Sequence, residues 1–196
     1  MKRRGMLLVI SAPSGGGKTT IVKEVLRQYP SFEFSVSATT RAIRPGERDG
    51  KDYFFLTRAE FEKKLAAGEL IEHEEIYSNY YGTLKSQVDD ALSNGKDIVF
   101  DVDVKGGLSI KSKFAEAILI FIKPPSLDIL KKRLEGRGSE TLEQVQRRMA
   151  RAQMELEKGE GYDYIITNDE LKRAVNEVFD IINKKRKEFS SGTETD

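Results

Sequence analysis

Four runs of apolar residues along the chain predict the strands of a buried sheet. They cover residues 6–11, 97–102, 117–122 and 163–167, and helical patterns separate them. Continuous apolar runs are typical of strands covered on both faces, whereas strands exposed on one face alternate apolar and polar positions. The pattern therefore predicts an α/β fold in which helices cover both faces of a central parallel sheet, giving three layers.

Helical periodicity and capping residues predict the helices. Thr57 with Glu60, and Thr141 with Gln144, have the spacing of capping boxes, and Ser126 is a further N-cap. We expect residues 188–196, rich in Ser, Thr and Glu, to form a frayed tail. The predicted helices span residues 18–29, 57–67, 85–95, 126–135, 141–158 and about 168–187, the last one capped by Asn168 or Asp169.

Residues 37–84 interrupt this alternation of strands and helices. The segment has short predicted strands at 34–37, 53–55 and 70–77, a polar loop at 39–52, and a predicted turn at 78–82. We expect it to form an inserted α+β subdomain. Residues 126–158 are predicted to form a helical, arginine-bearing segment outside the core. The core of a single domain over 1–196 then consists of residues 1–36, 85–125 and 159–190.

Composition narrows the classes of partner. The formal net charge is +1, whereas nucleic-acid and membrane-surface proteins usually carry a basic excess, so we expect neither partner. The chain has no cysteine, which fits a reducing cytosol, and no apolar run reaches the roughly 20 residues that span a bilayer. We expect a cytoplasmic protein that is a monomer or a homodimer.

A glycine-rich segment between the first strand and the first helix predicts a phosphate site. Glycines allow successive backbone N–H groups to surround an anion, and the following helix N-terminus adds to that field. Lys18 can reach the outer phosphates and the Thr19 hydroxyl can bind Mg²⁺. A plain glycine-rich turn would leave the Lys-Thr pair unexplained, and Ala12 replaces the first expected glycine. The predicted ATP contacts are Ala12, Pro13, Ser14, Gly15, Gly16, Gly17, Lys18, Thr19 and Thr20.

Two acids end the second apolar run. Ligands of open α/β sheets bind beyond the carboxyl ends of the strands, where Asp101 and Asp103 would meet the phosphate loop. An acid there can hold Mg²⁺ or its water shell, and we assign this role to Asp101. The alternative is that one of the two acids caps the next helix, and both interpretations can hold together.

Two groups of arginines are candidates for further phosphate contacts. Arg41 and Arg44 lie in the polar loop, where Glu47 can orient one of them. Taken alone, each of these two arginines is better explained as a solvated surface residue. Arg133, Arg137 and Arg148 form the second group in the helical segment 126–158, and like charges at helical spacing repel unless an anion is present. For their neighbours Arg147 and Arg151, a solvated helix face remains the alternative.

An ordered set of segments resembles the guanylate kinases, members of the nucleoside monophosphate kinase family. The resemblance runs from about residue 6 to 187, and its departures are Ala12, Lys105 where Gln is commoner, and Thr83 where Ser is common. It implies a P-loop core, a GMP-binding insertion and a lid. The matching segments are 11–19, 37–47, 50–53, 79–83, 101–103, 124–126, 133–138 and 167–169.

The resemblance also implies roles for individual residues. The guanine readers would be Ser37, Glu72, Thr83 and Asp103, and Asn168 and Asp169 would lie near the ATP adenine. A carboxylate at Glu72 can accept both guanine donors, N1–H and N2–H₂, and would reject adenine, whose N1 is an acceptor. The GMP phosphate would be held by Arg41, Arg44, Tyr53 and Tyr81, with Glu47 and Asp101 completing the acceptor site.

The predicted reaction is Mg²⁺-dependent transfer of the ATP γ-phosphoryl group to GMP or dGMP, giving ADP and a nucleoside diphosphate. The acceptor oxygen already belongs to a phosphate, so no general base is required. The alternatives are a kinase for another nucleotide, a P-loop regulatory binder, and a catalytically inactive guanylate-kinase-like interaction module. The predicted catalytic residues are Lys18, Arg44, Arg133, Arg137 and Arg148.

Overall fold

A five-stranded parallel sheet forms the centre of the computed structural model, which describes residues 5–136 and 141–191. The strand order is β2-β7-β1-β8-β9, and every neighbouring pair is parallel, so the predicted central sheet is confirmed. The strands are β1 (Leu7–Ser11), β2 (Phe32–Ser35), β7 (Asp97–Asp101), β8 (Ile118–Lys123) and β9 (Tyr164–Thr167).

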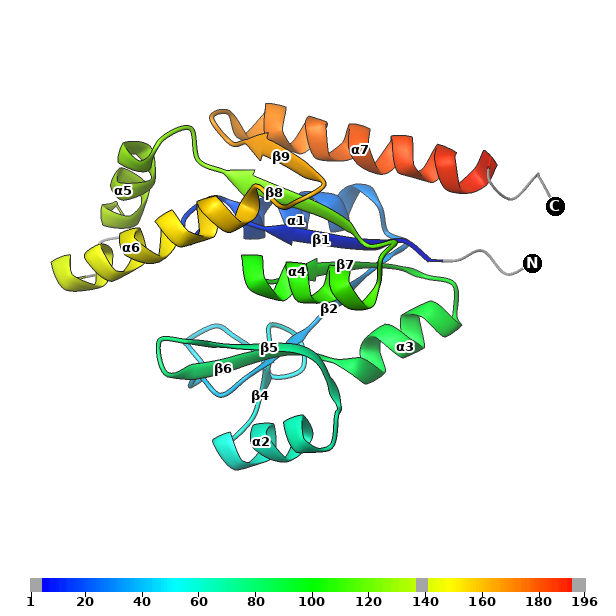
Figure 1. The fold of residues 1–196 in the computed structure, drawn as a ribbon, viewed down its shortest axis with the longest axis horizontal. Helices are drawn as coiled ribbons and strands as arrows, with labels where there is room; N and C mark the ends of the chain where they lie inside the picture. Colours follow the sequence, from blue (N-terminus) through cyan, green and yellow to red (C-terminus); the bar gives the residue numbers. More distant parts are fainter. Residues whose placement is uncertain (1–4, 137–140, 192–196) are drawn as a thin grey trace.

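Helices cover both faces of this sheet (Figure 1). On β1, Leu8 and Ile10 pack toward α1 (Lys18–Gln28) and α7 (Leu171–Ser191), while Leu7 and Val9 pack toward α3 (Lys85–Ser93) and α4 (Val104–Lys113). All four side chains are at most 1% exposed. Because both faces are dry, residues 7–10 of the strand are all apolar, which is the pattern that the sequence shows, and the polar Ser11 stands at the end of the strand.

The insertion, residues 37–84, contains a second sheet with its own small core. The strand order is β4-β3-β6-β5, and α2 (Arg58–Ala66) packs Phe61 against Ala38 and Leu70. The capping box predicted at Thr57 and Glu60 is present at the start of α2. The strands are β3 (Ser37–Thr39), β4 (Phe54–Phe55), β5 (Leu70–Ile76) and β6 (Asn79–Leu84).

The single strand predicted at residues 34–37 is wrong, because the chain changes sheets at Val36. β2 ends at Ser35 in the central sheet, and β3 begins at Ser37 in the insertion. The Gln87 side chain satisfies the Val36 backbone instead of a neighbouring strand, accepting from its N–H at 3.0 Å and donating to its carbonyl at 2.7 Å. Two side-chain hydrogen bonds thus replace the sheet ladder at this crossing.

The turn predicted at residues 78–82 is also wrong. The turn is the pair Tyr77 and Ser78, both at positive φ (50° and 65°), and β6 begins directly after it at Asn79. Gly82 lies inside β6, where a Cβ would meet the Glu72 carbonyl oxygen at 2.9 Å and the Phe61 ring at 3.1 Å. This glycine therefore marks a close approach within a strand rather than a turn.

Two helices form an arm beside the central sheet: α5 (Leu127–Glu135) and α6 (Leu142–Gly159). They pack together through Leu130, Leu134, Val145 and Ala152, which form a separate apolar cluster. Figure 1 shows the arm at one end of the molecule, at the side opposite to the start of β1 and the end of α7. The capping box predicted at Thr141 and Gln144 is present.

The predicted frayed tail begins too early, because α7 continues to Ser191. The Lys185–Glu188 ion pair and hydrogen bonds from the Ser191 hydroxyl support its last turns. The rest of that prediction, residues 192–196, lies outside the described residues. Among the residues that are described, no helix has the length and apolar character needed to cross a membrane.

Candidate active site

The phosphate-binding loop lies between β1 and α1, at the carboxyl edge of the central sheet. Gly15 and Gly17 have φ angles of 89° and 96°, which favour glycine, and the Gly16 N–H donates to the Pro13 carbonyl at 2.8 Å. The connection from β1 leads through α1 toward β2 at one edge of the sheet, whereas the connection from its neighbour β8 leads to β9 at the other edge, so the switch point of the sheet lies between β1 and β8, next to this loop. The loop opens into a cleft of about 370 Å³ that also receives Arg44, Arg148 and Arg151.

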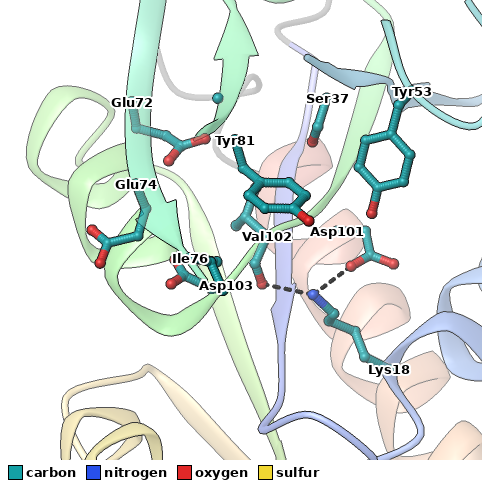
Figure 2. Close-up of a pocket in the computed structure, with 11 residues that line it drawn as sticks. Lys18, Ser37, Tyr53, Glu72, Glu74, Ile76, Tyr81, Asp101, Val102 and Asp103 are labelled. Atoms are coloured by element: carbon teal, nitrogen blue, oxygen red, sulfur yellow. Dashed lines mark hydrogen bonds and ion pairs between the residues drawn. The ribbon is translucent and has the colours of Figure 1, made fainter. Parts of the chain in front are cut away.

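Lys18 extends from the loop to the end of β7. Its Nζ lies 2.5 Å from Asp101 Oδ1 and donates to the Val102 carbonyl at 3.0 Å (Figure 2). Burial lowers the pKa of Lys18, but the charge and hydrogen bond of Asp101 outweigh it, so the pKa is raised and the lysine stays cationic. A positive charge is thus held at the junction of the two pockets described here.

Thr19 and Asp101 line the same cleft, where Thr19 is exposed at the first turn of α1. Their hydroxyl and carboxylate oxygens are hard donors of the kind that Mg²⁺ takes, and so they fit the predicted ion. Within residues 5–136 and 141–191 no group of three or more acidic, His or Cys side chains could hold a metal. Such a pair suits an ion that takes its other ligands from nucleotide phosphates and water.

Asn168 braces the phosphate-binding loop from β9. Its side-chain Nδ2 donates to the Gly16 carbonyl at 2.8 Å, and a Cβ on Gly17 would collide with the same amide. Arg133 Nη2 donates to the Asn168 carbonyl at 2.9 Å, so the arm reaches this point as well. Asp169 forms an ion pair with Arg173 at 2.6 Å. From the sequence we expected Asn168 and Asp169 to lie near the adenine. In the structure the Asn168 amide contacts the backbone of the loop.

A second pocket, of about 130 Å³, lies between the insertion and the end of β7. Cross-strand pairing sets Ser37 of β3 opposite Thr83 of β6, and Thr83 opposite Glu72 of β5. Since alternate residues of a strand share a face, Tyr81 and Glu74 follow in the next row on the same side. Figure 2 shows the pocket residues, which are Lys18, Ser37, Tyr53, Glu72, Glu74, Ile76, Tyr81, Gly82, Asp101, Val102 and Asp103.

Glu72 is the most deeply buried acid of this pocket, with 7% of its surface exposed. Burial raises its pKa to about 7, and the nearby carboxylates Asp103 and Glu74 act in the same direction. The hydrogen bond from Thr83 Oγ1 to Glu72 Oε1, at 2.6 Å, opposes the shift. The side chain therefore exchanges its proton near neutral pH.

The other acids of the pocket each face a cation. Asp101 pairs with Lys18, Glu74 with Lys105 at 2.5 Å, and Asp103 with Arg151 at 2.6 Å. Among the described residues, the hydrogen bond to Glu72 comes instead from the neutral Thr83 hydroxyl. A buried carboxylate in this state is stabilised by a ligand that brings N–H donors.

The two loop arginines have different surroundings. Arg41 donates from both terminal nitrogens to Glu47, at 2.8 and 3.1 Å, and lies 5.3 Å from the centre of the Tyr53 ring. This pairing lowers the pKa of Glu47. Arg44 is exposed and lines the cleft together with Tyr53 and Tyr81. Glu47 orients Arg41, as the sequence suggested for one of the two.

The arm contributes Arg148, whose Nη1 donates to Ser14 Oγ of the phosphate-binding loop at 3.0 Å. Arg147 is exposed and pairs with Glu143, which matches the solvated alternative. Arg151 is different: it lines the cleft and contacts Asp103. Arg137 lies outside the described residues.

Comparison with known proteins identifies the family and the fold. A family model described as guanylate kinase matches residues 4–185. The chain belongs to the guanylate kinase family. It is 50% identical over 176 residues to the guanylate kinase of Chlorobaculum tepidum, covering 89% of this chain and 90% of that one. The guanylate kinase of Symbiobacterium thermophilum is 43% identical over 92% of this chain and 86% of its own length.

A solved structure gives the same result. The crystal structure of guanylate kinase from Anaplasma phagocytophilum superposes with a TM-score of 0.75 at 30% identity, covering 94% of this chain and 88% of that one. Membership of the guanylate kinase family confirms the resemblance and the enzyme class, an ATP:GMP phosphotransferase. The P-loop kinase fold is likewise confirmed.

Some site residues were missed by the sequence reasoning. Glu74, Ile76 and Tyr77 come from the hairpin that was predicted as a strand followed by a longer turn. Arg151 and Glu155 come from α6. Helical spacing held a signal for Arg151, since it lies three residues after Arg148 and so on the same face.

Proposed function

We propose that this chain transfers the γ-phosphoryl group of Mg²⁺-bound ATP to GMP or dGMP, giving ADP and the guanine nucleoside diphosphate. The single observation that carries the proposal is Glu72, a buried carboxylate that meets a neutral hydroxyl in a pocket next to the phosphate-binding loop. In this pocket the ionised carboxylate requires N–H donors. Guanine presents two of them on one edge, N1–H and N2–H₂.

The other residues of the small pocket suit the rest of the acceptor. Ser37 and Asp103 line the place proposed for the base, the buried Thr83 supports it through its hydrogen bond to Glu72, and Tyr53 and Tyr81 line both this pocket and the cleft. We assign the acceptor phosphate to Arg44, Arg41 and the two tyrosines, with Glu47 orienting Arg41. Adenine would bring an unprotonated N1 against Glu72, which leaves two acceptors facing each other.

Transfer itself requires charge neutralisation rather than a base. A phosphate monoester is mostly dianionic at pH 7, since its second pKa is about 6, so the acceptor oxygen is already deprotonated. Lys18, Arg44 and Arg148 all line the cleft and would offset the repulsion between two polyanions. Arg133 and Arg137 are proposed to join them. Thr19 and Asp101 would hold Mg²⁺, which would neutralise part of the negative charge of the phosphates.

The three-part division is part of the same proposal. Residues 37–84 and 126–158 each enclose an apolar cluster of their own, which supports their moving as units against the core. We assign the first to GMP binding and the second, the arm, to a lid that excludes water during transfer. Asn168 and Asp169 are proposed to border the adenine of ATP. We further propose a cytoplasmic monomer or homodimer with no nucleic-acid partner.

The test is the acceptor dependence of ADP formation. ADP production from Mg-ATP is measured in parallel with GMP, dGMP, AMP, UMP and dTMP. We expect turnover with the two guanine nucleotides and little with the others. Absence of GMP-dependent turnover would contradict the proposal, and faster turnover with AMP would contradict the guanine assignment. The intact Lys18, Thr19 and Arg148 argue against the inactive interaction module.

A further inference from the structure

Arg151 of α6 joins two carboxylates at the boundary between the arm and the pocket of about 130 Å³ that we assign to the acceptor base, called the acceptor pocket below. Its Nη2 contacts Asp103 Oδ2 at 2.6 Å, and its Nε donates to Glu155 Oε1 at 2.9 Å. The three side chains are 16%, 13% and 5% exposed, so this is a largely buried network rather than a surface ion pair. Charge-assisted hydrogen bonds of this kind are strong and directional.

The Asp103 carboxylate is held through both oxygens. Oδ1 accepts from the Gly106 N–H at 2.8 Å and thereby caps α4, while Oδ2 accepts from Arg151. A Cβ on Gly106 would lie 2.8 Å from Glu72 Oε2 and 3.2 Å from Asp103 Oδ1. The two acids thus flank the same glycine, and the repulsion between them would turn Asp103 away if Arg151 did not hold it.

Arg151 lies at the point along α6 where the exposed first part of the helix gives way to a last part that packs against the core. Toward its start the helix exposes Leu142 (79%) and Arg147, whereas Gly159 is buried toward its end, against Phe121 of β8. Glu155, one turn after Arg151, fixes the guanidinium from this last part. The arm and the acceptor pocket therefore share one side chain.

We infer that Arg151 is a positioning residue for acceptor recognition, which holds Asp103 beside the base from the arm helix. The inference rests on the proposed function and adds to it a residue that acts through Asp103. Arg151 is then required for binding the acceptor base and contributes little to binding ATP. It also follows that Glu155 supports the acceptor pocket indirectly, because it holds Arg151 and Arg151 holds Asp103.

The experiment measures kcat and KM for GMP and for ATP in wild type, R151Q, D103N and the double variant, with R147Q as the matched control. Arg147 lies on the same helix but is exposed and pairs with Glu143 along α6. Loss of a charge-assisted contact predicts that R151Q raises the KM for GMP about tenfold or more. The KM for ATP and kcat at saturating GMP should change less than about threefold, and R147Q should resemble wild type.

The R151Q/D103N double variant distinguishes an effect of Arg151 that acts through Asp103 from an effect on the protein that is independent of Asp103. If Arg151 acts through Asp103, adding R151Q to D103N should raise the KM for GMP by less than about threefold. An equal effect in both backgrounds overturns the inference, as does a fall in kcat with an unchanged KM for GMP. Should R151Q not fold, R151K replaces it: a lysine keeps the charge but not the two-carboxylate bridge, so the same rise in KM is expected.

The inference and the proposed function fail in different ways. If wild type shows no GMP-dependent ADP formation, the proposed function fails. If wild type turns over GMP and R151Q is indistinguishable from it, only the role of Arg151 fails. Melting curves for each variant show whether a loss reflects unfolding.

Discussion

The Thr83 hydroxyl donates a 2.6 Å hydrogen bond to the buried carboxylate of Glu72, from the neighbouring strand of the insertion. This contact fixes one oxygen of Glu72 and leaves Oε2 next to Gly106, on the side of Asp103. A carboxylate constrained in this way has a defined edge to offer to a ligand. The first predictions follow from that constraint.

Substitution of Glu72 by Gln should damage acceptor recognition far more than ATP binding. The Gln amide accepts one guanine donor, but its NH₂ group then faces the second, and an unpaired polar contact is costly. We expect kcat/KM for GMP to fall about 100-fold and the KM for ATP to change less than about threefold. Steady-state kinetics with each substrate varied in turn checks this. Equal losses for both substrates would contradict the role of Glu72.

Affinity for GMP should depend on pH near neutrality. The pKa of Glu72 is raised to about 7, and GMP binding requires the ionised form, so affinity should decrease as pH falls below 7, by up to about tenfold per unit. The GMP phosphate titrates separately, near pH 6. The affinity for GMP is measured by calorimetry between pH 5.5 and 8.5 (about three units). Wild type should show two pH-dependent changes in affinity, one from Glu72 and one from the phosphate, and E72Q should show only the change from the phosphate. A change near pH 7 that persists in E72Q would contradict the assignment.

The same shift has a consequence for stability with a definite sign. The folded pKa of Glu72 lies above the unfolded value of 4.5, so the folded state holds the extra proton between them. This contribution is fully present below pH 4.5 and is lost as pH rises through about 7. E72Q removes the titration, so the stability of wild type relative to E72Q should decrease over that window. Chemical denaturation of both proteins at matched pH values measures the difference.

The adjacent glycines of α4 provide a matched pair of variants. A Cβ on Gly106 meets Glu72 Oε2 at 2.8 Å, the oxygen that Thr83 does not hold and that a small side-chain rotation can move, whereas a Cβ on Gly107 collides with the ring and hydroxyl of buried Tyr162. G106A should therefore stay folded, aided by the preference of about 1 kcal/mol for Ala over Gly in helices, and raise the KM for GMP. G107A should lower stability by several kcal/mol, about the cost of overpacking. Kinetics and thermal denaturation of both variants test this, and unchanged acceptor binding in G106A would contradict it.

Removal of the Asn168 amide should loosen the phosphate-binding loop. In N168A the buried Gly16 carbonyl loses its donor, which should cost about 1–3 kcal/mol of stability. The KM for ATP should rise because the loop carries the phosphate contacts, whereas the affinity for GMP alone should stay near that of wild type. Calorimetry with each nucleotide separates the two. D169A serves as the control, since Asp169 pairs with Arg173 at an exposed position, and should leave the stability of the loop unchanged.

Local signals in the sequence were sufficient for much of the fold. The capping boxes at Thr57 and Thr141 depend on residues three positions away, and both are present. The continuous apolar run of β1 indicated a strand covered on two faces, which it is. Lys18 and Thr19 could be placed for the same reason, because the motif and its strand-helix context are contiguous.

Features that depend on distant residues could not be predicted in this way. Where the chain changes sheets, the Val36 backbone is satisfied by Gln87, which is 51 positions away and carries no signal of its own. The tight turn at Tyr77 and Ser78 uses residues that rarely adopt positive φ, so Gly82 was the more obvious candidate. Arg151 pairs with Asp103 across 48 positions, and on sequence alone it resembles the solvated Arg147.

The pairing register of the insertion has a consequence for how substrate preference can evolve. Ser37, Thr83 and Glu72 come from three strands and share a face only because their rows are aligned. A slip of one residue in β6 would turn Thr83 to the opposite side and remove its hydroxyl from Glu72. Under the proposed assignment, base preference is a property of the whole small sheet, so insertions or deletions in its strands should be far less tolerated than changes of loop length. New acceptor specificities should arise through side-chain replacement on a fixed backbone.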